Sequence, residues 1–166
     1  DKIVTFGEIM LRLSPENNAR FTQCNAFEAV YGGGEANTAV SLANFDVDAN
    51  YVTKLPKHII GQAAINSLRH FLEKKTSQRP TNVIYNRAGS AFALATADDF
   101  NWDEIFDGAT WFHFSGITPA ISDEMTNICI TACQKAKEKG MTVSCDLNYR
   151  SKLWSSEKAC EAMSRI

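Results

Sequence analysis

The sequence predicts an α/β fold whose central sheet contains parallel strands, and three observations support this. A strand, a helix and a strand follow one another through residues 111–147, joined by short loops. Units of this kind place their two strands parallel through a right-handed crossover. A run of three glycines lies earlier, between another strand and another helix. With 166 residues, 45% of them hydrophobic, the chain can form one core, so one domain or a domain with a small appendage is expected.

Strands and helices alternate along the N-terminal half. Apolar, β-prone segments predict strands at residues 3–13, with a bulge or kink at Gly7-Glu8, at 27–31 and at 50–55. Small residues at helical spacing predict that the helix after the glycine run packs closely on the sheet: Ala36, Ala39, Val40 and Ala43. A second helix is expected from Gly61 to at least Arg69.

The C-terminal half contains the strand–helix–strand unit. Strands are expected at residues 82–87, 111–117 and 142–147. Between the last two, Ser122-Asp123-Glu124 caps a helix that extends over 125–139 and stops at Gly140. A final helix begins at Ser155 or Ser156.

The charge balance and the cysteines limit the class of protein. With a net charge of −2, the chain lacks the basic surface of a nucleic-acid binder or of a protein that adheres to membranes. No apolar run reaches membrane-spanning length and no signal pattern opens the chain, so a cytoplasmic protein is expected. The five cysteines are scattered without a CxxC pair, which favours a reducing compartment. Cys129 and Cys133 lie one helical turn apart and are interpreted as ordinary helix residues rather than metal ligands.

The most informative motif is the run Tyr-Gly-Gly-Gly-Glu-Ala-Asn at residues 31–37. Such a turn exposes backbone N–H groups at the positive end of a helix, where no Cβ atoms keep a ligand away. These donors, together with the amide of Asn37, suit a polyol or an anion. The alternative is an ordinary glycine cap or hairpin before a helix, and the local pattern leaves both interpretations open. The run is not GxGxxG, and the chain contains no nucleophile elbow, HExxH zinc motif or P-loop.

A ligand site is expected at the carboxyl ends of the parallel strands, where open α/β sheets bind their ligands. Those ends are residues 116–118 and 148–150. Asn148 and Arg150 point the same way if strand geometry persists, and an arginine there suits a carboxylate or a phosphate. A surface arginine paired with an acid is the alternative. Asp146 either orients one of these two side chains or accepts hydrogen bonds from loop N–H groups.

Two other sets of polar residues have an alternative, purely structural interpretation. Tyr85 and Arg87 share one face of their predicted strand and suit a sugar acid, or they belong to a solvated sheet face. His113, between Phe112 and Phe114, is interpreted as a packed histidine rather than a catalytic base.

Five separated segments together resemble the ribokinase-like (PfkB) carbohydrate kinases, and among them most the 2-keto-3-deoxygluconate kinases. They are residues 5–10, 31–37, 83–91, 112–120 and 146–150 with 153–155. The GGGEAN form of the glycine run, the YxRxxSA strand and the SGITPA segment distinguish this group from fructokinases and ribokinases. The resemblance extends over nearly the whole chain.

The resemblance implies a doubly wound α/β sheet with a small β lid that covers the sugar and serves in homo-oligomer contacts. Residues 1–166 then form the N-terminal part of one ribokinase-like domain, with lid strands drawn from about 8–31 and 71–91. In the family, further residues follow between 70 and 71 and after 166. The later ones include the aspartate base and the magnesium-associated acidic motif, so the 166-residue chain alone is expected to be inactive.

The resemblance also implies a substrate and roles for individual residues. The whole enzyme is expected to phosphorylate 2-keto-3-deoxygluconate with ATP and Mg²⁺, with no metal ligand in this chain. The residues expected to contact sugar hydroxyls are Gly33, Gly34, Glu35 and Asn37. Those expected to contact the acid group of the sugar are Tyr85, Arg87 and Arg150. Those expected to approach the nucleotide phosphates are Asn148, Tyr149 and Arg150. The alternatives are a fructokinase-like ketose kinase, a non-catalytic sugar-binding half-kinase module and a nucleotide-binding α/β protein without a sugar site.

Overall fold

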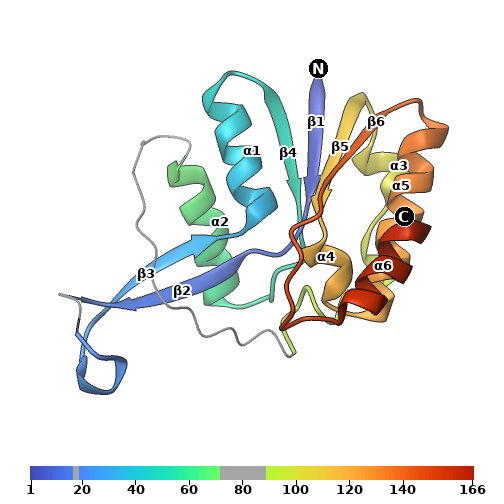
Figure 1. Ribbon diagram of the computed structural model, residues 1–166. Coiled ribbons are helices and arrows are strands. Elements are labelled where there is room, and N and C mark those ends of the chain that lie inside the picture. Colours follow the sequence, from blue (N-terminus) through green and yellow to red (C-terminus); the bar gives the residue numbers. More distant parts are fainter. Residues whose placement is uncertain (17–18, 72–88) are drawn as a thin grey trace.

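A computed structural model describes residues 1–16, 19–71 and 89–166. Its centre is a four-stranded sheet with the order β4-β1-β5-β6. All neighbouring strands in it are parallel: β1 (Lys2–Phe6), β4 (Asp48–Val52), β5 (Ala109–Ser115) and β6 (Thr142–Asp146). The four strands lie side by side in Figure 1, with their arrowheads at the same edge. This confirms the predicted α/β fold with a parallel sheet.

Helices cover both faces of the sheet. In Figure 1, α1 (Gly34–Asn44) and α2 (Ile59–Phe71) lie on one side, and α5 (Asp123–Glu138) lies on the other. Successive side chains of β1 point to opposite faces. The Thr5 hydroxyl donates to the Glu35 carbonyl of α1 at 3.0 Å, whereas Val4 and Phe6 enter the core formed with α5. The sheet is therefore doubly wound, as the resemblance implied.

The core on the α5 side is largely aromatic. The Phe6 ring lies 5.3 Å from the Phe92 ring, 5.1 Å from that of Phe100 and 5.1 Å from that of Trp102. The last two belong to a segment with two short helices, η3 (Ala97–Asp99) and α3 (Trp102–Ile105). The sequence of residues 92–110 predicts no element, because short helices carry too few turns to show a period. This segment closes the core on that side.

The predicted strand at residues 3–13 is wrong as a single strand, because it forms two strands in two sheets. β1 ends at Phe6, and β2 (Met10–Pro15) pairs antiparallel with β3 (Phe27–Gly32), with the short helix η2 (Phe21–Gln23) between them. An added Cβ on Gly7 would lie 2.2 Å from Oε2 of Glu35. The kink at Gly7 is thus a change of sheet, and the two-stranded ribbon extends away from the main sheet in Figure 1.

The strand–helix–strand unit is confirmed. The Met125 N–H donates to Ser122 Oγ at 3.0 Å, so Ser122 caps α5 as predicted, and Gly140 ends that helix region with φ 73°. The predicted strand at 111–117 is too long at its end, since α4 (Ile117–Ala120) begins there. Likewise β4 ends at Val52 rather than at 55. The final helix, α6 (Ser156–Arg165), is capped by Ser155.

Two other predictions concern the stretch around residues 70–91. The helix expected from Gly61 to at least Arg69 is α2, which extends to Phe71. The strand expected at 82–87 lies outside the described residues, as does most of the predicted second lid strand. Among the helices of the described residues, none has the length and apolar character needed to cross a membrane.

Candidate active site

The carboxyl ends of the four parallel strands and the N-terminus of α1 meet at one edge of the sheet (Figure 1). The β2–β3 ribbon leaves the main sheet at this same edge and leads directly into α1. The two segments that sequence analysis singled out, the glycine run and residues 148–150, therefore belong to one region of the molecule. Open α/β sheets bind their ligands at this edge.

The glycine run forms a tight junction between β3 and α1. Gly33 is the N-cap of α1 in an extended conformation and offers no side chain to the first-turn N–H groups. A Cβ on Gly33 would lie 2.1 Å from the Glu8 carbonyl oxygen, whereas a Cβ on Gly34 would meet nothing within 4 Å. The turn therefore presses its backbone on the β1–β2 junction on one side and is open on the other. The side chain of Asn37 is exposed, one turn into the helix.

Glu35 points into the protein rather than out of the turn. It is 3% exposed, and its Oε1 accepts hydrogen bonds from Ser115 N at 2.9 Å, Ser115 Oγ at 2.5 Å and Thr118 Oγ1 at 3.1 Å. These donors lie at the end of β5 and in α4. Burial and three donors on one oxygen favour a supporting role for Glu35 over the direct sugar contact that the resemblance implied.

The loop after β6 contains the second predicted cluster. The strand ends at Asp146, and Asn148 has φ 29°, so the strand geometry that would have pointed Asn148 and Arg150 the same way does not persist. The Asp146 carboxylate accepts from the Asn148 N–H at 3.1 Å, which supports its interpretation as an acceptor for loop N–H groups. The Tyr149 hydroxyl donates to the Trp154 carbonyl at 3.3 Å, which connects the loop to the residues before α6.

Arg150 is exposed in this loop, and among the described residues no carboxylate forms an ion pair with it. The alternative of a surface arginine neutralised by a neighbouring acid therefore has no support in that part of the chain. A guanidinium at the ligand edge of the sheet suits a carboxylate or a phosphate, since it presents two parallel N–H donors.

The sequence of the chain matches a known protein family. The profile of the family described as pfkB family carbohydrate kinase matches residues 1–166. The chain belongs to the pfkB family of carbohydrate kinases. The prediction drawn from the five sequence segments is thereby confirmed, both for the family and for its doubly wound fold.

Relatives in this family indicate a subgroup. A 2-dehydro-3-deoxygalactonokinase from Haloferax volcanii is 36% identical over 98% of the chain and 57% of its own length. The crystal structure of a 2-dehydro-3-deoxygluconokinase from Thermotoga maritima matches with 48% identity and a TM-score of 0.90, over 98% of the chain and 56% of that protein. Plant fructokinases match at lower identity. The chain thus spans just over half the length of these two relatives.

A more distant match shares only the fold. A sugar kinase from Pyrococcus horikoshii, solved in complex with ATP, matches with a TM-score of 0.79 and 22% identity, over 98% of the chain and 59% of its own. At this identity the match shows the fold alone. In residues 1–16, 19–71 and 89–166, no group of three or more His, Cys, Asp or Glu side chains is arranged to hold a metal ion.

Tyr85 and Arg87 lie outside the described residues. The described chain resumes at Gly89, and the next residue is anchored at the site, because the Ser90 hydroxyl donates to Glu8 Oε1 at 2.8 Å. Glu8 is itself buried beside the glycine turn. This contact was not predicted from the sequence. The available signal was a carboxylate flanked by two apolar strands, a residue that must find donors when it is buried.

The β1–β2 junction is also held by Tyr51. Its hydroxyl donates to the Gly7 carbonyl at 2.8 Å. Burial of the phenol, reinforced by the nearby carboxylates of Glu35 and Glu8, raises the pKa of Tyr51 far above its usual value. The side chain therefore stays a neutral donor at any ordinary pH, and the surface against which Gly33 packs is fixed.

His113 and the helix cysteines have structural surroundings. His113 is half-buried, and its Nδ1 lies 2.9 Å from Ser144 Oγ, which also accepts from Trp111 Nε1 at 2.8 Å. The interpretation as a packed histidine is supported. Cys129 and Cys133 are buried in α5, and burial raises the pKa of Cys133 to about 11.

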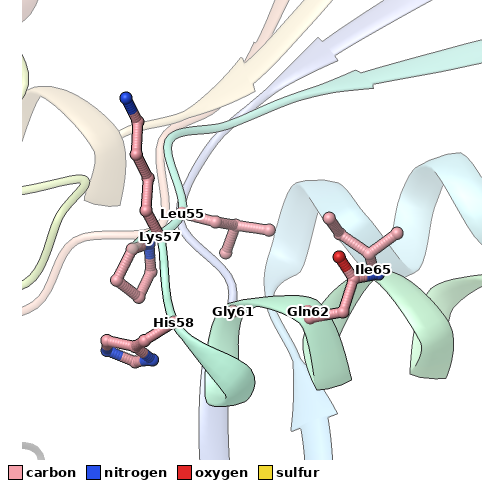
Figure 2. A pocket seen from close by; sticks show the side chains of 7 residues that line it. Leu55, Lys57, His58, Gly61, Gln62 and Ile65 are labelled. Carbon is pink, nitrogen blue, oxygen red and sulfur yellow. The ribbon is translucent and has the colours of Figure 1, made fainter.

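A hollow of about 410 Å³ lies next to the start of α2. Figure 2 shows the loop residues Leu55, Lys57 and His58 on one side of it and Gln62 and Ile65 of the helix on the other. His58 Nδ1 accepts from the Ile60 N–H at 3.3 Å, and the Tyr31 hydroxyl donates to the Ile60 carbonyl at 3.1 Å. These contacts join the start of α2 to β3, just ahead of the glycine run. The hollow could not be predicted from the sequence, because the loop has no recognisable motif.

Proposed function

We propose that the full-length protein is a sugar-acid kinase and that residues 1–166 form the N-terminal part of it. The enzyme transfers the γ-phosphoryl group of MgATP to the terminal hydroxyl of 2-keto-3-deoxygluconate. The observation that carries this proposal is the placement of the open glycine turn and of Arg150 at one edge of the sheet, with Arg150 in no ion pair among the described residues. The 36% and 48% identities to kinases named for 2-dehydro-3-deoxy sugar acids support the same substrate class.

The proposed roles of the described residues follow from their positions, and those of Tyr85 and Arg87 follow from the resemblance to the family alone. The exposed backbone at Gly34 and the side chain of Asn37 bind sugar hydroxyls, and Gly33 allows the close approach that holds this turn in place. Arg150, with Tyr85 and Arg87, contacts the acid end of the sugar. Neutral sugars lack a carboxylate for a guanidinium, so these residues select for sugar acids.

The loop after β6 also serves the nucleotide. Asn148, Tyr149 and Arg150 approach the phosphates of ATP, because the loop lies at the ligand edge and its conformation is held by Asp146 and by the Tyr149–Trp154 hydrogen bond. Phosphoryl transfer depends mainly on positioning and charge stabilisation. The chain described here supplies the positioning, whereas the base and the Mg²⁺ ligands belong to sequence beyond residue 166. The 166-residue chain alone is therefore inactive.

The β2–β3 ribbon acts as a lid over the sugar and as a contact between subunits. It exposes Leu11, Leu13 and Phe21, an amount of apolar surface that favours a partner. We propose a homo-oligomer in the cytoplasm. Analytical ultracentrifugation of the full-length protein tests this, with Leu13→Glu as the disrupting variant and Leu94→Glu, an exposed leucine far along the chain, as the control.

The test of the substrate is an ADP-release assay on the full-length protein with 2-keto-3-deoxygluconate, its galactonate epimer and fructose at equal concentration. The proposal expects turnover with a keto-deoxy acid at least tenfold faster than with fructose. Arg150→Ala should lower kcat/KM for the acid by about ten- to a hundredfold, as expected for a lost charge-assisted contact, and change that for fructose much less. Equal losses for both sugars would contradict the contact of Arg150 with the sugar acid and leave only its contact with the ATP phosphates.

A fructokinase-like ketose kinase is the second candidate, favoured by the matches to plant fructokinases. It expects fructose to be the faster substrate. The intact mass of the purified natural protein comes first, since a mass of 18.4 kDa would instead favour a sugar-binding half-kinase module without catalysis.

A further inference from the structure

A buried carboxylate connects the two proposed parts of the substrate site. Glu35 lies in the first turn of α1, one residue after Gly34, and its Oε1 accepts from Ser115 N, Ser115 Oγ and Thr118 Oγ1 at 2.9, 2.5 and 3.1 Å. Its own carbonyl accepts from the Thr5 hydroxyl at 3.0 Å. The residue is therefore tied to β1 through its backbone and to the end of β5 through its side chain.

The end of β5 is in turn locked to the end of β6. The Gly116 N–H donates to the Asp146 carbonyl at 2.7 Å, and a Cβ on Gly116 would lie 2.2 Å from the Leu147 carbonyl oxygen. Asp146 then accepts from the Asn148 N–H through its carboxylate. A continuous series of short contacts thus extends from Glu35 through Ser115 and Gly116 to the loop that contains Arg150.

The other side of Glu35 is equally constrained. A Cβ on Gly33 would meet the Glu8 carbonyl at 2.1 Å, and a Cβ on Gly7 would meet the Glu35 carboxylate at 2.2 Å. The glycine turn therefore cannot move toward β1, and the hydrogen bonds of the Glu35 carboxylate fix its position relative to β5. Burying a carboxylate costs free energy unless several donors bind it, so an apolar side chain would fill this space more favourably. A glutamate here therefore indicates a role beyond packing.

We propose that Glu35 is a positioning residue that fixes the glycine turn relative to the Asn148–Arg150 loop, without itself touching the sugar. This inference rests on the proposed function, in which one substrate must reach both segments. Such alignment acts on binding of the sugar acid, because a small displacement of either segment breaks contacts that the substrate makes simultaneously.

Kinetics of the full-length protein test the inference. Glu35→Ala should raise KM for the sugar acid by about tenfold or more, the size expected for loss of charge-assisted hydrogen bonds. Glu35→Gln should restore KM to within about threefold, since its carbonyl oxygen can still accept from Ser115 and Thr118. Phe106→Leu is the control. Phe106 is also buried, its ring lies 5.1 Å from the rings of Trp102 and Phe112, and its apolar side chain forms no hydrogen bond to α4 or to Glu35, so KM should stay unchanged.

A double-mutant cycle separates positioning from direct contact. If Glu35 acts through Ser115, then Ser115→Ala alone should raise KM for the sugar acid, and the double variant should be no worse than Glu35→Ala. If Glu35 touches the sugar itself, Ser115→Ala should leave KM unaltered, and the inference is overturned. A Glu35→Ala KM within twofold of the unsubstituted enzyme overturns it as well.

Hydrogen–deuterium exchange keeps this test separate from that of the proposed function. If the unsubstituted protein neither binds nor phosphorylates the sugar acid, the proposed function fails. The coupling itself then still stands if Glu35→Ala accelerates exchange at residues 32–34 and also at 147–150 while Phe106→Leu does not. Faster exchange at 32–34 alone would overturn the coupling.

Discussion

Oε1 of Glu35 and the backbone nitrogen of Ser115 are 80 residues apart in the chain and 2.9 Å apart in space. This contact joins the first turn of α1 to the end of β5 across the ligand edge of the sheet. It explains why a glutamate stands inside a glycine turn that otherwise avoids side chains. The backbone of the turn is open at Gly34, and the buried Glu35 side chain fixes the turn to β5.

Close packing of Gly33 on Glu8 predicts a large difference between neighbouring glycines. Gly33→Ala should lower the free energy of unfolding by more than ~2 kcal/mol, because its Cβ would overlap the Glu8 carbonyl oxygen. Gly34→Ala should be neutral or slightly stabilising, since its Cβ enters open space at the start of a helix. Urea denaturation of both variants measures this. Equal midpoints would show that the turn yields more easily than the contact suggests.

The aromatic core predicts a strong effect at Phe112. This ring is fully buried and lies 5.1 Å from the Phe106 ring and 5.8 Å from that of Trp102. Phe112→Ala should cost about 3–5 kcal/mol of unfolding free energy, from lost transfer energy and the cavity left behind. Phe45→Ala is the control, since Phe45 is 81% exposed and should change stability by less than ~0.5 kcal/mol. Thermal unfolding followed by circular dichroism would reveal the contrast.

Helix α5 predicts a capping effect at Ser122. Removing the hydroxyl that accepts from the Met125 N–H leaves that donor without its cap, so Ser122→Ala should cost about 1 kcal/mol. Ser122→Asp restores an acceptor at the same place and should recover most of the loss. The measurement is the denaturation midpoint of each variant. If aspartate destabilises as much as alanine, the cap is not what stabilises this helix start.

The cysteines predict selective chemistry with a pH dependence. Burial raises the pKa of Cys133 to about 11 and that of Cys145 to about 12. Cys129 is also buried, whereas Cys160 is exposed. Alkylation at pH 8 followed by mass spectrometry should modify Cys160 first and Cys129 and Cys133 last. Rapid modification of Cys133 in the native protein would contradict this order.

The sign of the accompanying stability change follows from the same pKa shifts. An unfolded thiol ionises near its usual pKa of about 8.5, whereas the folded thiols stay protonated until pH 11–12. The unfolded state therefore loses protons first, and stability should fall as the pH rises above about 9. Cys133→Ala should weaken that alkaline decrease, as measured by denaturation at pH 8 and pH 10.

Several features of the fold were decided by local sequence, and these were predicted well. Ser122 and Gly140 bound α5 because capping and helix termination depend on a few neighbouring residues. The glycine run had to separate a strand from a helix for the same local reason. The strand–helix–strand unit then followed from general rules of chain connection.

Other features depended on residues far apart in the chain. Residues 3–13 are β-prone throughout, and the close contact between Gly7 and Glu35 decided that they form two strands rather than one. Packing at the sheet edge likewise set the end of β4 and the start of α4. Sequence alone determined that this protein is a parallel α/β chain with a glycine turn and an arginine at its ligand edge. Only the tertiary structure decided that Glu35 faces inward, because the donors that stabilise its charge lie 80 and 83 residues away and come together only when the sheet forms.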